Sequence, residues 1–344
     1  MKRTIITLEE AIGKQLAHDL TQIDAKAGTK GARFRKGHVV SEEDLPTLRN
    51  MGRDNLSILE MEEGDVHEND AAIRLSSVLC GDNLTVTPPS EGRCNLIASC
   101  DGFLDYDADA IHRINEDLDW VVATLSPRRS VRKGQVVAGF RIRPIVMDEA
   151  RVQRAVDVAR AIRVRPFKPL KVGLVTTGKE IAEGRVEDAF ADKFRGKLET
   201  FKGELIGQRF CTDDASLIAA AIRSFLTEGA QLVVCTGGMS VDADDRTPGA
   251  IREVATRVAF QGLPLLPGAM ALLGWVEQEG QEPCALIGAP ACVVHDERTA
   301  LDRLLPYVFA GVDPGNSIRR WGVGGLCEQC RVCHWPACSF AANE

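Results

Sequence analysis

The sequence predicts a doubly wound α/β fold for its main domain, residues 170–311, with a small α/β unit and a mostly β module before it. Short runs that contain only apolar residues, such as Leu232–Cys235, are typical of strands buried on both faces of a parallel sheet. These runs alternate with longer segments of helical periodicity, as βαβ units require. Glycine-containing loops also follow three of the runs directly, which is typical of ligand-binding loops in such folds.

Residues 1–68 are expected to form the small α/β unit. Apolar residues at helical spacing open it and indicate a first helix: Leu8, Ala11, Ile12 and Leu16. Ser41 and Asp44 then form a capping box for a second helix that runs to Met51. Residues 55–60 follow as a strand, which completes an α/β arrangement.

Residues 69–148 are expected to form the mostly β module, because their apolar residues are scattered among Gly, Pro and Asp turns. Within it, residues 120–125 and 135–138 read as paired strands. A charged amphipathic helix in residues 149–169 is expected to link this module to the main domain. Prolines near its end mark the domain boundary.

The main domain is expected to alternate strands and helices. The strands are predicted at residues 172–175, 205–210, 232–235 and 285–287, and the helices at residues 188–202, 215–228, 248–254 and 296–309. In an open α/β sheet the ligand lies beyond the carboxyl ends of the strands. The loops that leave those ends therefore define the expected binding site.

Three glycine loops leave the predicted strands at this edge. Consecutive glycines allow the backbone to approach a ligand closely and to turn its N–H groups toward phosphate oxygens. We therefore expect an anion-binding pocket built from these loops. The candidate residues are Thr177, Gly178, Glu180, Thr236, Gly237, Gly238, Ser240, Gly288 and Pro290.

Two acidic pairs stand beside the glycine loops, Asp213-Asp214 and Asp244-Asp245. Each pair precedes a predicted helix, so one carboxylate of a pair is a natural helix N-cap. Carboxylates next to a bound phosphate raise the electrostatic cost of binding unless a cation offsets them. The sequence therefore predicts a divalent cation at this site.

The last part of the chain, residues 312–344, is rich in cysteine. Cys327, Cys330, Cys333 and Cys338 have the spacing C-x2-C-x2-C-x4-C, and thiolates are soft ligands suited to zinc or an iron–sulfur cluster. We expect a metal-binding tail of one of these two kinds, in which His334 is able to replace one sulfur. The other seven cysteines are scattered through mostly apolar surroundings, which is typical of reduced core thiols.

The composition limits the classes of function. The net charge of −7 gives no basic field for nucleic acid, and no apolar run approaches the ~20 residues that span a bilayer. Glu9 and Glu10 come too soon for the apolar region of a signal peptide. We therefore expect a cytoplasmic protein that binds neither nucleic acid nor membranes.

Four segments resemble the molybdopterin-binding domain: residues 172–183, residues 213–214, residues 236–247 and residues 266–268. That domain is shared by the molybdopterin molybdenumtransferase, the molybdopterin adenylyltransferase and the competence-damage-inducible protein family. In this family a Gly-Gly-hydroxyl loop and helix N-termini hold the pterin's phosphate, and acidic residues assist Mg²⁺ and molybdate chemistry. The resemblance implies that Gly237, Gly238 and Ser240 form the loop. It also implies that Asp214 and Asp245 are the catalytic and Mg²⁺-binding residues.

Some positions depart from the molybdenumtransferase pattern. Lys179 stands where that pattern has an aspartate, and Ala269-Met270 replace a Lys-Pro pair. Residues 287–291 replace its Leu-Pro-Gly-Asn-Pro loop. The modules before the main domain are nonetheless more similar to the molybdenumtransferase branch than to the single-domain adenylyltransferase.

The resemblance implies an enzyme that binds molybdopterin or adenylated molybdopterin and assists molybdate insertion with release of AMP. The altered loops favour an alternative, a non-catalytic molybdenum cofactor carrier or sensor that serves a molybdoenzyme. A molybdoenzyme and a second copy of this chain in a homodimer remain open as partners. The choice between molybdenum and tungsten is also open.

Overall fold

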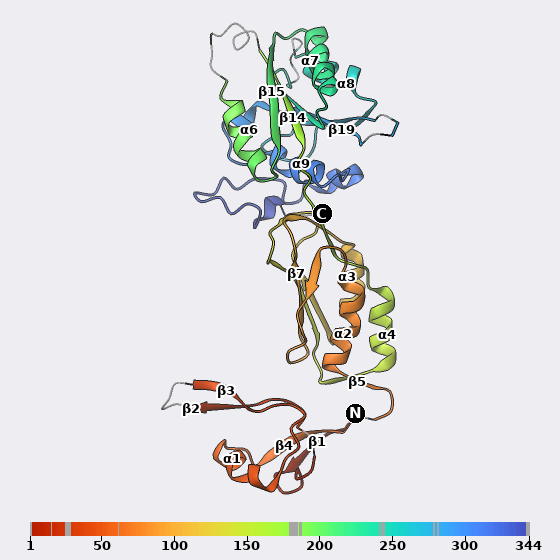
Figure 1. The fold of residues 1–344 in the computed structure, drawn as a ribbon, viewed down its shortest axis with the longest axis vertical. Coiled ribbons are helices and arrows are strands. Elements are labelled where there is room, and N and C mark those ends of the chain that lie inside the picture. The colour runs from red at the N-terminus through yellow and green to blue at the C-terminus, as the bar shows by residue number, and fades with distance from the viewer. Residues whose placement is uncertain are drawn as a thin grey trace. The chain divides into compact units, whose positions relative to one another are not determined.

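A computed structural model of the chain describes residues 2–14, 16–24, 29–60, 62–178, 185, 188–240, 242, 245–277, 279–280 and 282–341. The chain divides into two compact units (Figure 1). The first unit comprises Met1–Ser99, Tyr106–Leu125 and Gly134–Arg163, and the second comprises Cys100–Asp105, Ser126–Lys133 and Val164–Glu344. Among the described residues, no helix combines the length and apolar character needed to cross a membrane.

The beginning of the first unit is built from two antiparallel strand pairs and a short helix. Its elements are β1 (Lys2–Thr7) paired with β4 (Asn55–Glu60), β2 (Leu20–Asp24) paired with β3 (Thr29–Phe34), the 3-10 turn η1 (Glu42–Asp44) and α1 (Leu45–Asn50). The predicted capping box is confirmed, since the side chain of Asp44 accepts from the backbone N of Ser41 at 2.9 Å. The strand at residues 55–60 is confirmed as well.

The helix predicted from Leu8, Ala11, Ile12 and Leu16 is absent from the described residues, and that prediction is wrong. Residues 2–7 are a strand and residues 8–13 are turns. Leu8, Ala11 and Leu16 are nevertheless buried in the small core around Leu48. The turn at residues 8–13 brings these side chains into one core. The backbone before the turn is extended, because β1 pairs with β4 along its whole length.

The rest of the first unit combines an antiparallel sheet with three helices. The sheet has the order β6-β7-β11-β9, with β6 at Leu84–Val86, β7 at Cys94–Ala98, β11 at Val136–Ile142 and β9 at Trp120–Thr124. The predicted strand at residues 120–125 does pair with the strand that follows it, but the paired residues of β11 are 138–142, which lie further along the chain than the predicted 135–138. The helices are α2 (Glu68–Leu79), α3 (Ala108–Asn115) and α4 (Glu149–Val158). The module predicted as mostly β is thus a mixed α and β structure.

The helix predicted in residues 149–169 is shorter than expected. Helix α4 ends at Val158, and β13 (Arg163–Pro166) follows it. Helix α4 packs against α2 and α3, while β5 (Asp65–His67) pairs with β12 (Val146–Asp148). Because its apolar face is used inside the first unit, α4 is a structural part of that unit.

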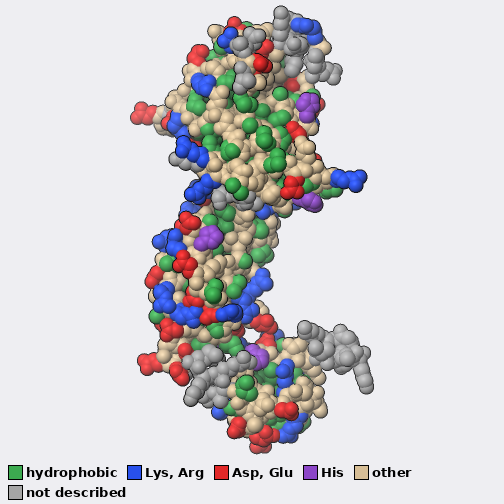
Figure 2. Space-filling model, turned by 180° about the vertical axis from the view of Figure 1, so that it is seen from behind, with side chains coloured by type: hydrophobic (Ala, Val, Ile, Leu, Met, Phe, Trp, Pro, Cys, Tyr) green, Lys and Arg blue, Asp and Glu red, His purple; other side chains and the backbone are tan. Residues whose placement is uncertain are grey.

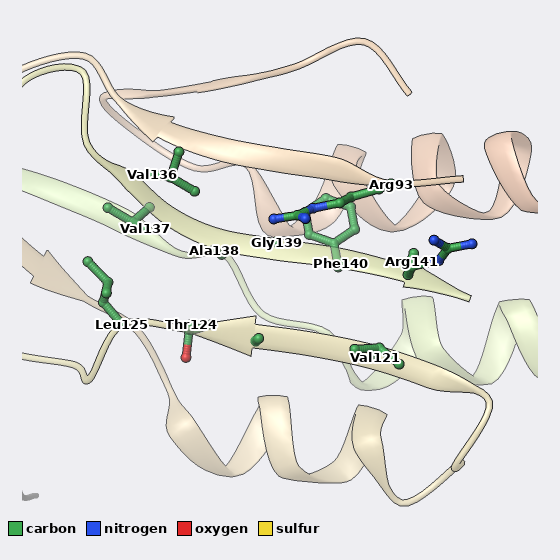
Figure 3. Close-up of a pocket in the computed structure, with 11 residues that line it drawn as sticks. Arg93, Val121, Thr124, Leu125, Val136, Val137, Ala138, Gly139, Phe140 and Arg141 are labelled. Atoms are coloured by element: carbon green, nitrogen blue, oxygen red, sulfur yellow. The ribbon is translucent and has the colours of Figure 1, made fainter. Parts of the chain in front are cut away.

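One face of the antiparallel sheet carries a shallow hollow of about 430 Å³, which Figure 3 shows in close-up. Val121 and Val136 are exposed there, beside Gly139. Arg93 and Arg141 supply its positive charge. None of these residues belongs to the binding site predicted from the sequence.

The second unit contains a six-stranded sheet of order β15-β14-β16-β19-β18-β17. Its strands are β14 (Lys171–Thr177), β15 (Glu204–Cys211), β16 (Leu232–Thr236), β17 (Arg257–Gln261), β18 (Leu272–Val276) and β19 (Cys284–Ala289). The first four in spatial order are parallel, and the last two are antiparallel to their neighbours. The predicted doubly wound fold is confirmed, and β17 and β18 are additions that the sequence did not predict.

Helices cover both faces of this sheet. The helices are α6 (Phe190–Glu199), α7 (Ala215–Thr227), α8 (Thr247–Val254) and α9 (Ala300–Phe309). Alternate residues of β16 enter two cores, since Val234 packs with α6 and α9 whereas Val233 packs with α7 and α8. A Cβ on Gly173 would lie 2.4 Å from the ring of Phe225, so glycine allows α7 to sit close to β14.

The order of the strands places the expected site. Strand β14 comes first in this sheet and has later strands on both sides, β15 and β16. The chain thus reverses direction across the sheet between β14 and β16, which makes their carboxyl ends a topological switch point. Ligands of doubly wound folds bind at such a point.

The cysteine-rich segment that the sequence separates as a tail is packed onto the second unit. Trp321 and Phe340 are buried at 1% and 3% exposure and belong to its larger core. Nη1 of Arg303 donates to the carbonyl oxygen of Phe340 at 3.3 Å. This segment is therefore an integral layer of the domain.

On the face drawn in Figure 2, acidic and basic side chains are interspersed over both units. Hydrophobic side chains appear between them as small patches. The charge of this face is therefore distributed and does not form one continuous field.

Candidate functional site

The first two glycine loops meet at the carboxyl ends of β14 and β16. A Cβ on Gly237 would lie 2.3 Å from the carbonyl oxygen of Thr177, and one on Gly238 would lie 3.0 Å from Oγ1 of Thr247. The φ angles of Gly237 and Gly238 are 88° and 54°, in the left-handed region that favours glycine. Both positions thus require glycine, one by space and both by backbone conformation. We call residues 177–178, residues 237–238 and the start of α8 the glycine cradle.

Two buried threonines hold the cradle together. Oγ1 of Thr247 donates to the carbonyl oxygen of Gly237 at 2.8 Å and lies 3.4 Å from Oγ1 of Thr177. Thr177 and Thr247 are exposed by only 3% and 0%. Because these hydroxyls are paired inside the protein, the position of the loop relative to α8 is fixed before any ligand binds.

Helix α8 presents an uncapped N-terminus to the cradle. Its N-cap residue, Arg246, makes no side-chain capping hydrogen bond, and Pro248 occupies the first turn. Helix α7 differs, because Oδ1 of Asp214 accepts from the backbone N of Ser216 at 2.8 Å and of Leu217 at 3.1 Å. The N-terminal partial charge of α8 is thus the one that remains for an anion.

The acidic residues differ in their surroundings. Oδ2 of Asp245 is buried and has no hydrogen-bond partner among the described residues. A buried carboxylate oxygen without a partner costs folding free energy unless a ligand satisfies it. Asp213 is exposed, and its Oδ1 lies 3.5 Å from the position of a Cβ on Gly238. Asp244 lies outside the described residues, as does Glu180 of the first loop.

The remaining predicted residues have mixed placements. Gly178 has a φ of 136°, and its backbone N donates to the carbonyl oxygen of Cys211 at 3.1 Å. Thr236 is buried at the end of β16, and Ser240 is exposed after the loop. The cradle thus contains Thr177, Gly178, Gly237 and Gly238, with Ser240 at its margin.

The third glycine loop has a packing role in the structure. A Cβ on Gly288 would lie 2.4 Å from Cε of Met239, and both Gly288 and Pro290 are buried. Met239, which follows the second glycine loop, is buried over the end of β19. Because Gly288 has no side chain, it leaves room for the side chain of Met239, which in turn supports the cradle.

Two further side chains, those of Thr247 and Gln208, lie near the cradle. Neither is among the site residues predicted from the sequence. Nε2 of Gln208 donates to Oγ1 of Thr176 at 2.9 Å and also contacts Oδ2 of Asp188. A threonine directly before a proline at a helix start was the available signal for Thr247, whereas the partners of Gln208 depend on the sheet register.

The structure also places the cysteines. All eleven are thiols. Burial raises the pKa of Cys284 to about 12 and raises that of Cys235 still further, as expected of core thiols. The four cysteines of the tail line a pocket of about 500 Å³ together with His334 and Arg298. In the described part of the chain, no three His, Cys, Asp or Glu side chains are placed to hold one metal ion.

Two family models match parts of the chain. Residues 173–310 match the family described as "Probable molybdopterin binding domain". Residues 5–60 match a family described as "Domain of unknown function (DUF8806)". The first match coincides with the six-stranded sheet and its helices, and the second with the beginning of the first unit.

Curated relatives are similar over shorter stretches. A CinA-like protein of Mycolicibacterium gilvum is 32% identical over 104 residues, which is 30% of this chain and 24% of the relative. A CinA-like protein of Mycobacterium avium is 35% identical over 77 residues, 22% of this chain and 18% of the relative. The matched stretch thus spans about a quarter or less of the length of these relatives.

Solved structures are similar over about two fifths of the chain. The molybdopterin biosynthesis enzyme MoaB of Thermus thermophilus is 22% identical with a TM-score of 0.35, and the match covers 40% of this chain and 91% of that one. The tungsten cofactor synthesizing protein MoaB of Pyrococcus furiosus is 18% identical with a TM-score of 0.33, over 41% and 91%. Residues 173–310 of this chain are thus similar to the family described as a probable molybdopterin-binding domain.

Proposed function

We propose that the second unit binds molybdopterin, or its adenylated form, through the phosphate at the cradle. The match of residues 173–310 to the molybdopterin-binding family supports the class of ligand. The close approach of Gly237 to Thr177, at the switch point of the sheet, supports the cradle as the place where the ligand binds. In this proposal the backbone N–H groups of the two loops and of the first turn of α8 receive the phosphate oxygens.

Side chains at the margin of the cradle would orient the ligand. The exposed hydroxyl of Ser240 would donate to a phosphate oxygen, and Arg246 brings a positive charge to the start of α8. Thr177 and Thr247 would keep the loops in place without contacting the ligand, since their hydroxyls are buried and lie against each other. The cradle therefore needs little rearrangement on binding, which lowers the entropic cost.

We further propose that Asp245 helps to hold Mg²⁺ beside the phosphate. Its buried, unpartnered Oδ2 among the described residues is the observation that supports this role. A bound Mg²⁺ would polarise the phosphoryl oxygen. The resemblance also implies Asp214 as a Mg²⁺-binding residue. Its Oδ1 already caps α7, so Asp214 would bind Mg²⁺ in addition to this structural role.

The reaction that this site would serve is molybdate insertion into adenylated molybdopterin with release of AMP, in the cytoplasm. The proposal makes the chain an enzyme of the molybdenumtransferase type, with Asp214 and Asp245 as its catalytic residues. Molybdate is then a substrate, and a molybdoenzyme is the receiver of the product.

A carrier or sensor of the cofactor is the second candidate. One observation favours it: Ala269 and Met270 follow Gly268 where the molybdenumtransferase pattern has a lysine and a proline, so a phosphate-facing cation is lost. A Cβ on Gly268 would lie 2.7 Å from the backbone N of Ala300, so the turn itself is tightly packed against α9. Such a protein would bind the pterin without cleaving the anhydride.

One experiment separates the two candidates. Purified protein is incubated with adenylated molybdopterin and Mg²⁺, with and without molybdate, and the AMP released and the pterin retained are both measured. Molybdate-dependent release of AMP identifies the insertion enzyme. Retention of the pterin without AMP release identifies the carrier. Failure to retain either form of the pterin would remove both proposals.

A further inference from the structure

The cysteine pocket lies in the second unit and shares no residue with the glycine cradle. Its walls come from residues 295–298 and from residues 327–340. Cys330 is exposed, and the other three tail cysteines are half-buried. The four thiols thus surround a hollow of about 500 Å³ and are reachable from solvent.

The segment that carries these thiols is anchored at both ends. The backbone N of Cys327 donates to the carbonyl oxygen of Leu266 at 2.8 Å. At the other end Phe340 is buried, and its carbonyl oxygen accepts from Arg303. Because the ends are fixed, the loop between them is partly ordered before a ligand binds, which reduces the cost of binding.

Two arginines place positive charge beside the thiols. Nε of Arg298 donates to Sγ of Cys333 at 3.3 Å, and its Nη1 contacts Oδ1 of Asp302 at 3.0 Å. Arg129 is half-buried and interacts electrostatically with Cys338. Its Nε is buried and has no hydrogen-bond partner within the described residues. Half-buried cations of this kind are stabilised by a negatively charged group nearby.

The arrangement does not suit a single metal ion. No three potential ligands among the described residues are placed to hold one ion. A tetrahedral zinc site, with Zn–S bonds of about 2.3 Å, brings its sulfurs to about 3.8 Å from one another. In a four-iron cluster each cysteine binds a different iron, so the sulfurs surround a larger body. The hollow of about 500 Å³ that the four thiols line leaves room for this larger body.

We propose that this pocket binds a [4Fe–4S] cluster through Cys327, Cys330, Cys333 and Cys338. Each thiol releases its proton to solvent as its sulfur binds one iron of the cluster, and no electron is transferred in this step. A cluster core of charge 2+ with four thiolates has a net charge of about −2. Arg298 and Arg129 offset that charge, and the hydrogen bond from Arg298 to the Cys333 sulfur stabilises the reduced cluster.

The test uses the full chain, purified without oxygen and then reconstituted anaerobically with sulfide and equal amounts of ferrous and ferric iron, which together give a core of charge 2+. Iron, acid-labile sulfide and zinc are measured per chain, together with the visible absorption of the cluster. We expect about four iron and about four sulfide per chain, with zinc absent from the tail. One zinc per chain held by the four thiols, or no metal with all four thiols open to alkylation, would overturn the proposal.

Matched variants identify the ligands. Cys330→Ser changes the exposed thiol and is expected to lose most of the iron, whereas Cys100→Ser changes a half-buried cysteine outside the pocket and should retain it. His334→Ala, in the pocket wall, should also retain the cluster. Circular dichroism of each variant separates loss of the cluster from loss of the fold. Loss of iron in the folded His334→Ala protein, with retention in Cys330→Ser, would contradict the four-cysteine assignment.

Discussion

Oγ1 of Thr247 donates a hydrogen bond of 2.8 Å to the carbonyl oxygen of Gly237, which ties the first turn of α8 to the glycine loop after β16. The same hydroxyl lies 3.4 Å from that of Thr177, at the end of β14. One buried side chain therefore connects both loops of the cradle. The position of the site depends on this contact as much as on the glycines.

The change Thr247→Val tests that contact. It keeps the shape of the side chain but leaves the carbonyl oxygen of Gly237 without this donor, which should cost about 1–3 kcal/mol of unfolding free energy. Pterin binding should weaken in parallel, because the loop loses its support. Urea unfolding and pterin retention are the measurements, with the exposed Thr200→Val as control. Equal stability of the two variants would show that the contact is not important.

Gly238→Asp should abolish pterin binding. The new side chain starts 3.0 Å from Oγ1 of Thr247 and brings a negative charge to the place proposed for the phosphate. We expect affinity to fall about 100-fold or more, equal to about 2.7 kcal/mol. Gly196→Asp is the matched control, since a Cβ there meets nothing within 4 Å. Unchanged retention of pterin by the Gly238 variant would contradict the proposed site.

Asp245→Asn should reduce Mg²⁺-dependent pterin binding far more than Asp242→Asn. The first change removes the charge of a half-buried carboxylate whose buried Oδ2 is unpartnered among the described residues, and the second alters an exposed one. Because the removed charge is poorly compensated in the protein alone, Asp245→Asn should not lower the unfolding free energy. Titration of Mg²⁺ for each variant, with thermal unfolding, provides the comparison. Equal Mg²⁺ dependence would assign the cation to other residues.

Asp214 allows its two proposed roles to be separated. Asp214→Ala removes the cap of α7 and should cost about 1 kcal/mol, whereas Asp214→Asn keeps an accepting oxygen and should cost much less. If Asp214 also binds Mg²⁺, the asparagine variant should still lose Mg²⁺ affinity. Chemical unfolding and Mg²⁺ titration of both variants distinguish the cases. Normal Mg²⁺ affinity in the asparagine variant would leave Asp214 with the capping role alone.

Phe340 should stabilise the whole second unit. It is 3% exposed and packs beside Trp335 at a ring distance of 5.9 Å, so Phe340→Ala should cost about 3 kcal/mol or more. Val332→Ala, at a side chain that is 69% exposed, should cost little. Urea unfolding followed by tryptophan fluorescence measures both. A tail that unfolds without affecting the domain would give two transitions instead of one.

The sequence by itself determined the elements whose signals are local. The capping box of Ser41 and Asp44 was readable because its two partners are three residues apart. The buried strand at residues 232–235 was readable because only a strand covered on both faces is apolar throughout. The glycine loops and the α/β class followed from the same kind of pattern, and the family match of residues 173–310 agrees with them.

The tertiary structure alone decided which of these elements meet. The helical spacing of Leu8, Ala11 and Leu16 did not specify a helix, because pairing of β1 with β4 overrides a local preference. The contact of Thr247 with Gly237 depends on the order of the strands in the sheet, and so does the packing of Gly288 against Met239. The tail became part of the core through Trp321 and Phe340. These contacts join residues far apart in the chain, and their energies depend on packing that no local sequence window contains.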